Sequence, residues 1–334
     1  MLQLRIHAPG KVSLDEVSQP EPGPHDAVVR VQACGICGSD LGYISIGGVA
    51  GPRPEPTPLG HEFSAVVERV GAEVRSVELG ARVVVNPIAA GNSIGNGGSS
   101  GAFSPEVLVC NVDGGDVLFP IPDALCADHA ALAEPLGVGM QAVNKAEVSP
   151  GDKVTIFGAG PIGLMALATL RHRGFDDVAI IDLSEKRLGI AKELGATLTL
   201  NPAEGDVWAA LRELHGTALF LDIVPCTGTD AYIEASGAGS VIGEIIGEAR
   251  PGARLSVVAL HREPEPVNFI SVMAKQLTIR GSMAYPEDFG EMVRMLGEVD
   301  LSPVITHRFS LAEVEQAFAV AHDASVAGKV IVAP

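Results

Sequence analysis

The sequence lacks a long uninterrupted apolar segment. Its longest apolar stretch, Val154–Leu170, is broken by glycine and proline, so no membrane-spanning helix is predicted. The first residues after Met1 contain no extended apolar core, so we expect no secretory signal. Positive charge is also scarce. There are 23 Lys and Arg against 41 Asp and Glu, a formal net charge of −18, which argues against nucleic acid as a partner because its phosphates would be repelled.

Cysteine is sparse as well. The five cysteines are an odd number with no spacing typical of a disulfide framework, which indicates a reducing compartment. We therefore expect a cytoplasmic protein. A chain of 334 residues is long enough for two domains rather than one core.

What the sequence does contain is a glycine-rich turn between an apolar strand and a helix. The run Val154–Phe157 is short and apolar, as in a parallel strand covered on both faces. Gly158, Gly160 and Gly163 follow in the pattern G-x-G-x-x-G, which allows a tight turn, close approach of a pyrophosphate and close helix packing. Pro161 suits the first helical turn, whose N–H groups would face the phosphates.

The context of this turn favours a dinucleotide site over an ordinary glycine turn. A second apolar strand, Val178–Ile181, ends in Asp182, at the distance expected for the acid that binds the adenosine ribose. A carboxylate there repels a 2′-phosphate, which favours NAD over NADP. Arg187 can be interpreted as an argument for NADP, as a solvated helix residue, or as a contact to the adenosine end of NAD. The predicted cofactor-binding residues are Gly158, Gly160, Pro161, Ile162, Gly163, Asp182 and Arg187.

The first part of the chain has a different pattern. Residues Leu2 to Val85 contain short alternating strands separated by glycine and proline turns, so a β-rich domain is expected. The later part alternates strands and helices, which predicts a doubly wound sheet. Amphipathic helices are expected at Pro286–Leu296 and Leu311–Ala321, and the strand from Lys329 would return to the first domain. A helix is also expected at Ser184–Leu194, with Ser184 as its cap.

Candidate metal ligands occur on separate elements of this first domain. Cys37 follows the expected strand Ala27–Ala33, His61 and Glu62 precede the expected strand Phe63–Val70, and Glu134 lies in an expected helix. Thiolate, imidazole and carboxylate are common zinc ligands, and a catalytic zinc site keeps one position open. Alternatives are half of a zinc ribbon or a redox pair with Cys34, although the chain has no second Cys-x-x-Cys and no thioredoxin-like unit around the pair. Cys34, at the strand end, is expected in the core.

These motifs, taken together, resemble a known family. Cys34-Gly-Ile-Cys37-Gly-Ser-Asp40, Gly60-His-Glu62, Ala133-Glu-Pro-Leu136 and Gly158–Gly163 occur in the order and spacing of the zinc-dependent medium-chain alcohol dehydrogenases. The resemblance is greatest to the branch of sorbitol and other polyol, butanediol and threonine dehydrogenases. It implies a discontinuous GroES-like catalytic domain, residues 1–150 and 286–334, and a Rossmann NAD-binding domain, residues 151–285. It also implies a homodimer or homotetramer that associates through the sheet edge of the cofactor domain.

The resemblance assigns roles to individual residues. Cys37, His61 and Glu62 would bind one catalytic zinc per subunit, and Glu134 would be a fourth ligand or reach the metal through water. Ser39 would relay the hydroxyl proton of an alcohol substrate, and that substrate would be oxidised to a ketone. The remaining implied roles are orientation of His61 by Asp40, a pocket wall at Tyr43, and a cofactor contact at Arg187.

Two departures from the family pattern affect these expectations. The segment Gly91–Gly101 has no cysteine, and Cys110 stands alone after it, so no structural zinc is expected. Gly42 occupies the position at which the family usually has a histidine that ends the proton relay, so the proton must leave by another route. Two other functions remain open from the sequence: a zinc-free reductase of the same fold and a non-catalytic NAD-binding protein.

Overall fold

The structure is a computed structural model that describes all 334 residues, Met1–Pro334. The chain forms two compact bodies. The first contains Met1–Glu134, Glu287–Asp323 and Lys329–Pro334, and the second contains Pro135–Pro286 and Ala324–Gly328. None of the helices is both long enough and apolar enough to cross a membrane.

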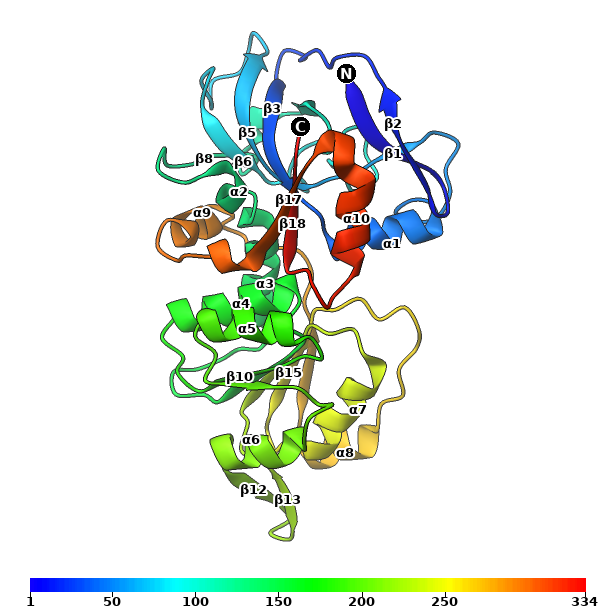
Figure 1. Cartoon of the computed structure of the whole chain (residues 1–334). Coiled ribbons are helices and arrows are strands. Elements are labelled where there is room, and N and C mark those ends of the chain that lie inside the picture. Colours follow the sequence, from blue (N-terminus) through cyan, green and yellow to red (C-terminus); the bar gives the residue numbers. More distant parts are fainter. The chain divides into compact units, whose positions relative to one another are not determined.

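The first body is built on two sheets (Figure 1). The smaller sheet has the order β2-β1-β4, and the larger has the order β17-β18-β3-β5-β6-β8, with β7 also paired to β3. The strands are β1 (Leu2–Ala8), β2 (Lys11–Glu16), β3 (Ala27–Gly35), β4 (Thr57–Pro58), β5 (Glu62–Val70), β6 (Arg82–Val85), β7 (Glu106–Val109), β8 (Leu118–Pro120), β17 (Ile305–Ser310) and β18 (Lys329–Ala333).

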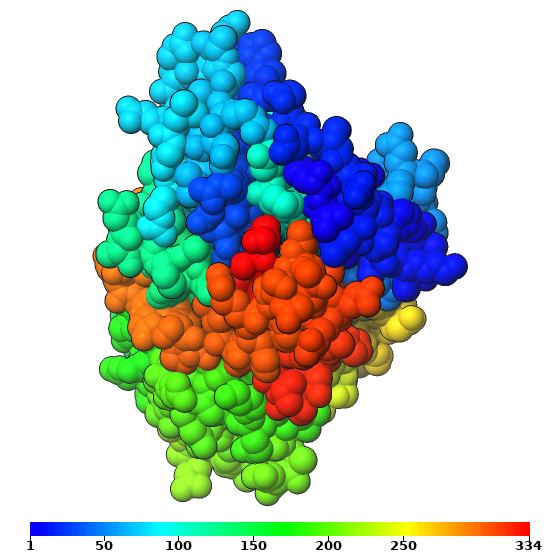
Figure 2. Space-filling view, turned by 45° about the horizontal axis from the view of Figure 1, so that its top comes forward, coloured from blue at the N-terminus to red at the C-terminus, as the bar shows by residue number.

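Short helices complete this body. They are α1 (Gly38–Ile46), α2 (Ala127–Ala130), α9 (Gly290–Leu296) and α10 (Val314–His322), with 3-10 turns at Val112–Gly114, Ser302–Val304 and Leu311–Glu313. The last strand, β18, pairs with β3 in antiparallel fashion and with β17 in parallel. In the space-filling view the red C-terminal residues accordingly lie beside orange and blue residues, so both ends of the chain build this body (Figure 2).

The second body contains a six-stranded parallel sheet in the order β11-β10-β9-β14-β15-β16. The order reverses between β9 and β14, as expected for a doubly wound sheet. Its elements are α3 (Ala133–Lys145), which enters from the first body, β9 (Val154–Phe157), α4 (Pro161–His172), β10 (Val178–Ile181), α5 (Glu185–Glu193), β11 (Leu198–Leu200), α6 (Val207–His215), β12 (Thr217–Phe220), β13 (Val224–Thr227), β14 (Ala231–Glu234), α7 (Gly239–Glu248), β15 (Arg254–Val257), α8 (Phe269–Ala274) and β16 (Thr278–Gly281).

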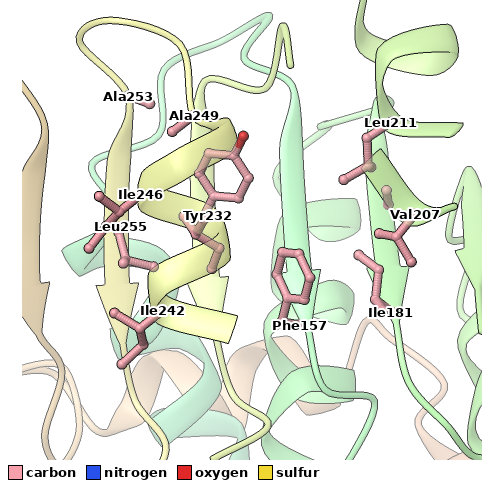
Figure 3. Packing of buried hydrophobic residues seen from close by; sticks show 12 residues of the cluster. Phe157, Ile181, Val207, Leu211, Tyr232, Ile242, Ile246, Ala249, Ala253 and Leu255 are labelled. Atoms are coloured by element: carbon pink, nitrogen blue, oxygen red, sulfur yellow. The ribbon is translucent and has the colours of Figure 1, made fainter. Parts of the chain in front are cut away.

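Apolar side chains hold one face of this sheet to its helices. Phe157, Tyr232 and Leu255 project from neighbouring strands toward Leu211 of α6 and Ile246 of α7 (Figure 3). Each of these side chains is buried. Burial of a large apolar side chain contributes about 1.5–3 kcal/mol, so this layer fixes the sheet that carries the glycine turn.

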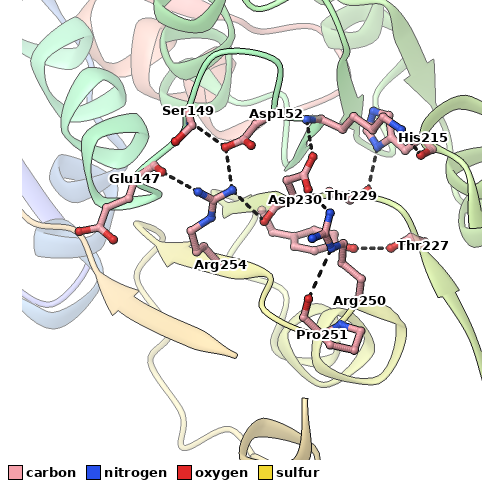
Figure 4. A network of polar contacts seen from close by, with 12 residues as sticks. Glu147, Ser149, Asp152, His215, Thr227, Thr229, Asp230, Arg250, Pro251 and Arg254 are labelled. Carbon is pink, nitrogen blue, oxygen red and sulfur yellow. Dashed lines mark hydrogen bonds and ion pairs between the residues drawn. The ribbon is translucent and has the colours of Figure 1, made fainter. Parts of the chain in front are cut away.

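The amino ends of the same strands are closed by polar contacts (Figure 4). Arg254 donates to Asp152 Oδ2 at 2.7 Å and to the Glu147 carbonyl at 2.8 Å. Asp230 accepts from the Lys153 N–H at 2.9 Å and pairs with Arg250. This leaves the carboxyl ends of the strands as the open edge, where doubly wound sheets bind ligands.

The boundary between the bodies differs from the expected residue 150. Residues 135–150 belong to the second body, because Gly139 allows α3 to approach α4 closely: a Cβ there would lie 2.6 Å from the Met165 Cβ. The segment Ala324–Gly328 also belongs to the second body, where the Ala327 carbonyl accepts from Arg187 Nε at 2.8 Å.

Three elements were not anticipated from the sequence. These are the helix α1 inside the β-rich region, the short helix α8, and the antiparallel hairpin of β12 and β13. The hairpin carries exposed apolar residues at Leu221 and Ile223, and its turn contains no Gly, Pro or Asn-Gly that would have indicated it. The expected helix over 286–296 begins later, at Gly290.

Candidate active site

Three of the expected metal ligands converge in the first body. Cys37 stands immediately before α1, His61 immediately before β5, and Glu62 opens β5. One ligand atom from each side chain lies within 4.8 Å of the other two, and the imidazole and carboxylate are buried. A thiol, an imidazole and a carboxylate at such spacing fit zinc, which takes these donors in tetrahedral sites.

The register of the sheet explains why these side chains meet. Gly35 at the end of β3 faces Glu62 across the antiparallel ladder. A Cβ on Gly35 would collide with Glu62 Oε2, so only glycine leaves room for the carboxylate there. Cys37 follows Gly35 by two residues, which brings its thiol to the same end of the sheet.

Asp40 and Ser39 surround the imidazole of His61. Asp40 is buried, and its Oδ2 accepts from the Cys37 N–H at 2.9 Å, which caps α1. Its Oδ1 lies 3.5 Å from His61 Nδ1, and neither of these two buried atoms has a hydrogen-bond partner. Ser39 Oγ lies 3.3 Å from His61 Nε2 on the other side of the ring. The ring therefore has Nδ1 toward a carboxylate and Nε2 toward a hydroxyl.

Glu62 forms an ion pair that the sequence reasoning did not identify. Lys329 Nζ lies 2.8 and 2.6 Å from the two carboxylate oxygens and 3.0 Å from the Ile36 carbonyl, and the Lys and Glu side chains are almost fully buried. Burial lowers the pKa of Lys329, but Glu62 and other nearby groups outweigh this effect and raise that pKa above its ordinary value. A lysine that opens an otherwise apolar closing strand was the available signal.

The charges at the site also act on the other ligands. Burial raises the pKa of the Cys37 thiol, and the Glu62 carboxylate raises it further. Burial lowers the pKa of His61, but Asp40 and Cys37 together outweigh it and raise that pKa well above its ordinary range.

The remaining expected residues lie around this set. Glu134 is buried in the first turn of α3, and its charge acts on Lys329, but it is not one of the three residues grouped within 4.8 Å. Tyr43 is half-buried on α1, and its hydroxyl donates to Asn96 Oδ1 at 3.3 Å. Burial raises the pKa of this phenol. Gly42 is buried beside it on the same helix.

The segment Gly91–Gly101 packs against the strand end that carries His61. The Ala102 and Phe103 N–H groups donate to the carbonyls of Gly60 and Leu59, at 2.9 and 3.1 Å. A Cβ on Gly95 would collide with the Gly60 carbonyl, so this contact requires glycine. The lobe is therefore held by backbone contacts, and Asn96 brings it to Tyr43.

The glycine turn borders a cavity of about 550 Å³ in the second body. Gly158 has φ of 99°, and a Cβ on Gly163 would collide with the Gly158 carbonyl, so the helix packs directly on the turn. Pro161 is the first residue of α4 and Ile162 the second. The cavity is lined by Gly158 and Gly160 among others, but not by Pro161, Ile162 or Gly163.

Asp182 and Arg187 line the same cavity. Asp182 accepts from the N–H groups of Ala159 and Ser184, each at 2.7 Å, so the end of β10 is tied to the glycine turn. Ser184 caps α5 by accepting from the Arg187 N–H, as the sequence predicted. One guanidinium nitrogen of Arg187 lies 3.8 Å from the position of a Cβ on Gly160. The carboxylate, the guanidinium and the turn thus face one ligand-sized space.

Comparisons with known proteins agree with this geometry. The family model described as alcohol dehydrogenase GroES-like domain matches residues 23–123, and the model described as zinc-binding dehydrogenase matches residues 161–298. The (R,R)-butanediol dehydrogenase of Neisseria gonorrhoeae is 32% identical over 366 aligned positions, covering 100% of this chain and 99% of that protein. Human sorbitol dehydrogenase is 32% identical, covering 95% and 91%. The crystal structure of 2R,3R-butanediol dehydrogenase from Bacillus subtilis matches with a TM-score of 0.86 at 26% identity, covering 100% and 99%.

The chain belongs to the zinc-dependent medium-chain alcohol dehydrogenase family, in the branch that contains butanediol and sorbitol dehydrogenases. It is a dehydrogenase with a GroES-like body and a Rossmann-type body, and the family uses a nicotinamide cofactor and a catalytic zinc. The expected family and fold class are confirmed, and neither the zinc-free reductase nor the non-catalytic protein is favoured.

Proposed function

We propose that this chain oxidises a secondary alcohol of a vicinal diol or polyol with NAD, and reduces the matching ketone in the reverse direction. The convergence of Cys37, His61 and Glu62 in the catalytic body of a zinc dehydrogenase carries this proposal. The substrate class is suggested by the relatives, which are named as butanediol and sorbitol dehydrogenases.

We infer that Cys37, His61 and Glu62 hold one zinc per subunit, and that Glu134 is a fourth ligand or contacts the metal through water. When bound, zinc is a Lewis acid that lowers the pKa of a coordinated hydroxyl toward about 7. Asp40 would fix the orientation of His61, because a carboxylate beside the second ring nitrogen selects the tautomer of a ligating histidine. Lys329 would keep the Glu62 carboxylate ionised.

Ser39 is the group we assign to the alcohol proton. Its hydroxyl lies 3.3 Å from Nε2 of His61, one of the three inferred ligands. Tyr43 would form part of the substrate wall, and its bond to Asn96 makes the Gly91–Gly101 lobe part of that wall. The lobe contains no cysteine, which supports the absence of a structural zinc.

We infer NAD rather than NADP as the cofactor. The Asp182 carboxylate faces the cavity beside the glycine turn and would repel a 2′-phosphate. Gly158, Gly160 and Gly163 would seat the pyrophosphate, with Pro161 and Ile162 in the first turn of α4. Arg187 would contact the adenosine half from α5.

Self-association through the edge strand β16 fits the exposed side chains of the second body. This strand pairs only with β15, so its outer edge has unpaired backbone groups. Exposed apolar side chains nearby on the chain include Phe269, Ile270 and Met273 of α8, with Ile279 and Met283. We propose a homodimer or a homotetramer that covers them. Light scattering on the purified chain tests this, and a monomer at micromolar concentration would contradict it.

The decisive test of the function combines metal analysis with turnover. We expect one zinc per subunit and NAD reduction with butanediols or sugar alcohols, in a panel that also contains simple secondary alcohols and threonine. Two zinc ions per subunit would contradict the assignment of a single site. No zinc, with activity only in the reductive direction, would move the chain to the zinc-free reductases. The free state of all five cysteines suits a reducing cytoplasm, our proposed location.

A further inference from the structure

The strands at which the sheet order reverses end in one buried carboxylate. Glu234 is the last residue of β14, and it lies in register with Phe157 of β9 and Val257 of β15. The strand order reverses between β9 and β14. Glu234, at the carboxyl end of β14, therefore lies at the point where open α/β sheets bind their ligands. None of the functions described so far uses this side chain.

The carboxylate of Glu234 is completely buried, and both of its oxygens accept hydrogen bonds. Oε1 accepts from the Ser236 N–H at 2.8 Å, the Ser236 hydroxyl at 2.6 Å and the Gly237 N–H at 2.9 Å. Oε2 accepts from His261 Nε2 at 2.7 Å. Four donors around one buried carboxylate make a rigid centre, because loss of any of them would leave a buried charge poorly solvated.

These bonds join two turns at the open edge of the sheet. The carboxylate holds the turn Ala235–Ala238, and the Glu234 carbonyl accepts from Val258 and Ala259, at 2.9 and 3.2 Å, at the start of the turn that follows β15. The two turns touch, since a Cβ on Gly237 would lie 3.6 Å from the Leu260 carbonyl. Glu234 therefore sets the position of both turns.

The first turn is also part of the cofactor cavity. Ala235, Ser236 and Ala238 line it, and a Cβ on Gly158 would lie 2.7 Å from the Ser236 N–H nitrogen. In a doubly wound fold the strands on one side of the reversal bind one mononucleotide half, and those on the other side bind the second half. Asp182 marks the adenosine side, so β14 and β15 carry the other half.

His261 is bonded on one side only. A carboxylate can only accept, so Nε2 carries the proton in this bond. The ring is largely buried, with 12% of its side chain exposed, and Nδ1 has no hydrogen-bond partner. In the neutral ring Nδ1 is thus a buried acceptor without a donor, at the edge where the second half of a dinucleotide would lie.

We propose that Glu234 and His261 are positioning residues for the nicotinamide of the dinucleotide, and that His261 Nδ1 is open to a donor from that group, such as its carboxamide N–H. This inference rests on the proposed NAD function. A pair with a purely structural role would, when mutated, weaken the binding of both halves of the cofactor alike. A positioning pair would weaken the binding of the nicotinamide half alone.

The test compares two ligands that differ only in the nicotinamide. NADH and ADP-ribose are titrated against the wild-type chain, Glu234→Gln and His261→Leu, by fluorescence and calorimetry. We expect the Kd for NADH to rise about tenfold, the effect of one lost polar contact, and the Kd for ADP-ribose to change less than twofold. Steady-state KM for NAD should rise correspondingly. The control Glu193→Gln changes an exposed carboxylate of α5 and should leave both constants unchanged.

A conservative variant separates positioning from folding. His261→Gln retains an N–H that can reach the Glu234 carboxylate, so we expect it to recover most of the NADH affinity, with a cofactor-free melting temperature near wild type. Equal losses for both ligands in His261→Gln, or equal losses or no loss in Glu234→Gln, would overturn the positioning role even if His261→Leu fails to fold. A wild-type chain that binds NADH and turns over with NAD, while the Glu234→Gln variant binds NADH as tightly as wild type, would contradict the inference alone. A chain that binds neither would contradict the proposed function and the inference that rests on it.

Discussion

Replacement of Lys329 by methionine should destabilise the metal-free enzyme strongly. The change keeps most of the side-chain volume but removes the ammonium group that lies 2.8 and 2.6 Å from the Glu62 oxygens. Glu62 is fully buried, so its charge would be left without a partner. Breaking a buried ion pair from one side costs about 3–5 kcal/mol, and we expect the free energy of unfolding to fall by that amount.

Two conditions separate this electrostatic effect from a packing defect. Urea unfolding followed by circular dichroism is measured on zinc-stripped and zinc-loaded protein. The loss should be smaller with zinc, because the cation would compensate the Glu62 charge. The double variant Glu62→Gln, Lys329→Met should be less destabilised than Lys329→Met alone, since it removes both charges. Lys192→Met, at an exposed position of α5, is the control and should change stability by less than about 0.5 kcal/mol.

A zinc-stripped Lys329→Met variant as stable as wild type would refute this electrostatic role. A double variant that lost the sum of the two single effects would refute it as well, because the residues would then act independently. Either result would mean that the pair is not what keeps a carboxylate buried next to Cys37 and His61.

Three further outcomes follow from the structure. Cys37→Ser should lose its zinc, and its turnover should fall by more than about 100-fold, which exceeds the usual effect of mutating a residue that only supports a metal ligand. Its NADH affinity, measured by fluorescence, should stay unchanged. Normal turnover would refute the metal assignment. Gly163→Val should weaken NADH binding and cost about 1–3 kcal/mol, since its Cβ meets the Gly158 carbonyl, which calorimetry and urea unfolding will show. Burial lowers the pKa of His215 to about 4 from 6.5. Its contribution to the free energy of unfolding is therefore fully present above pH 6.5 and is lost as the pH drops toward 4. Between neutral pH and pH 5, the free energy of unfolding of the wild type should fall by about 2 kcal/mol more than that of a His215→Gln variant. If the free energies of unfolding of the two proteins changed in parallel with pH, this role of His215 would be excluded.

The sequence predicted those parts of the fold that are encoded locally. The glycine turn, its flanking strands β9 and β10 and the helix α4 are specified by one continuous stretch, because a positive φ at Gly158 and the absence of a Cβ at Gly163 are properties of single residues. The same holds for the cap of α5 at Ser184.

The parts that depend on distant residues could not be predicted in this way. The turn that joins β12 to β13, Leu221–Ile223, contains no glycine, proline or Asn-Gly, so its pattern resembled a loop. The domain boundary moved from 150 to 135 because of the close approach of α3 to α4 at Gly139, a contact that no local pattern reveals.

The candidate site divides along the same line. Cys37, His61 and Glu62 were selected by residue type and motif, and the structure brings them within reach of one ion, although their role as ligands stays a prediction. Lys329 and the pair of Glu234 and His261 were missed, because each partner lies 27 or more residues away from the other. A buried charge is visible in a sequence only as a charged residue in an apolar strand.

Both missed pairs have the same physical role in different bodies. Each places a buried carboxylate, Glu62 or Glu234, at the end of a strand, where it accepts from one side chain of a later part of the chain. A carboxylate held in this way cannot relax when a ligand arrives, so it keeps the geometry of its neighbours. In the first body those neighbours are the proposed metal ligands, and in the second they are the turns at the proposed cofactor cavity. The ligand sites are therefore preorganised by contacts that lie one layer behind the residues that the motifs identify.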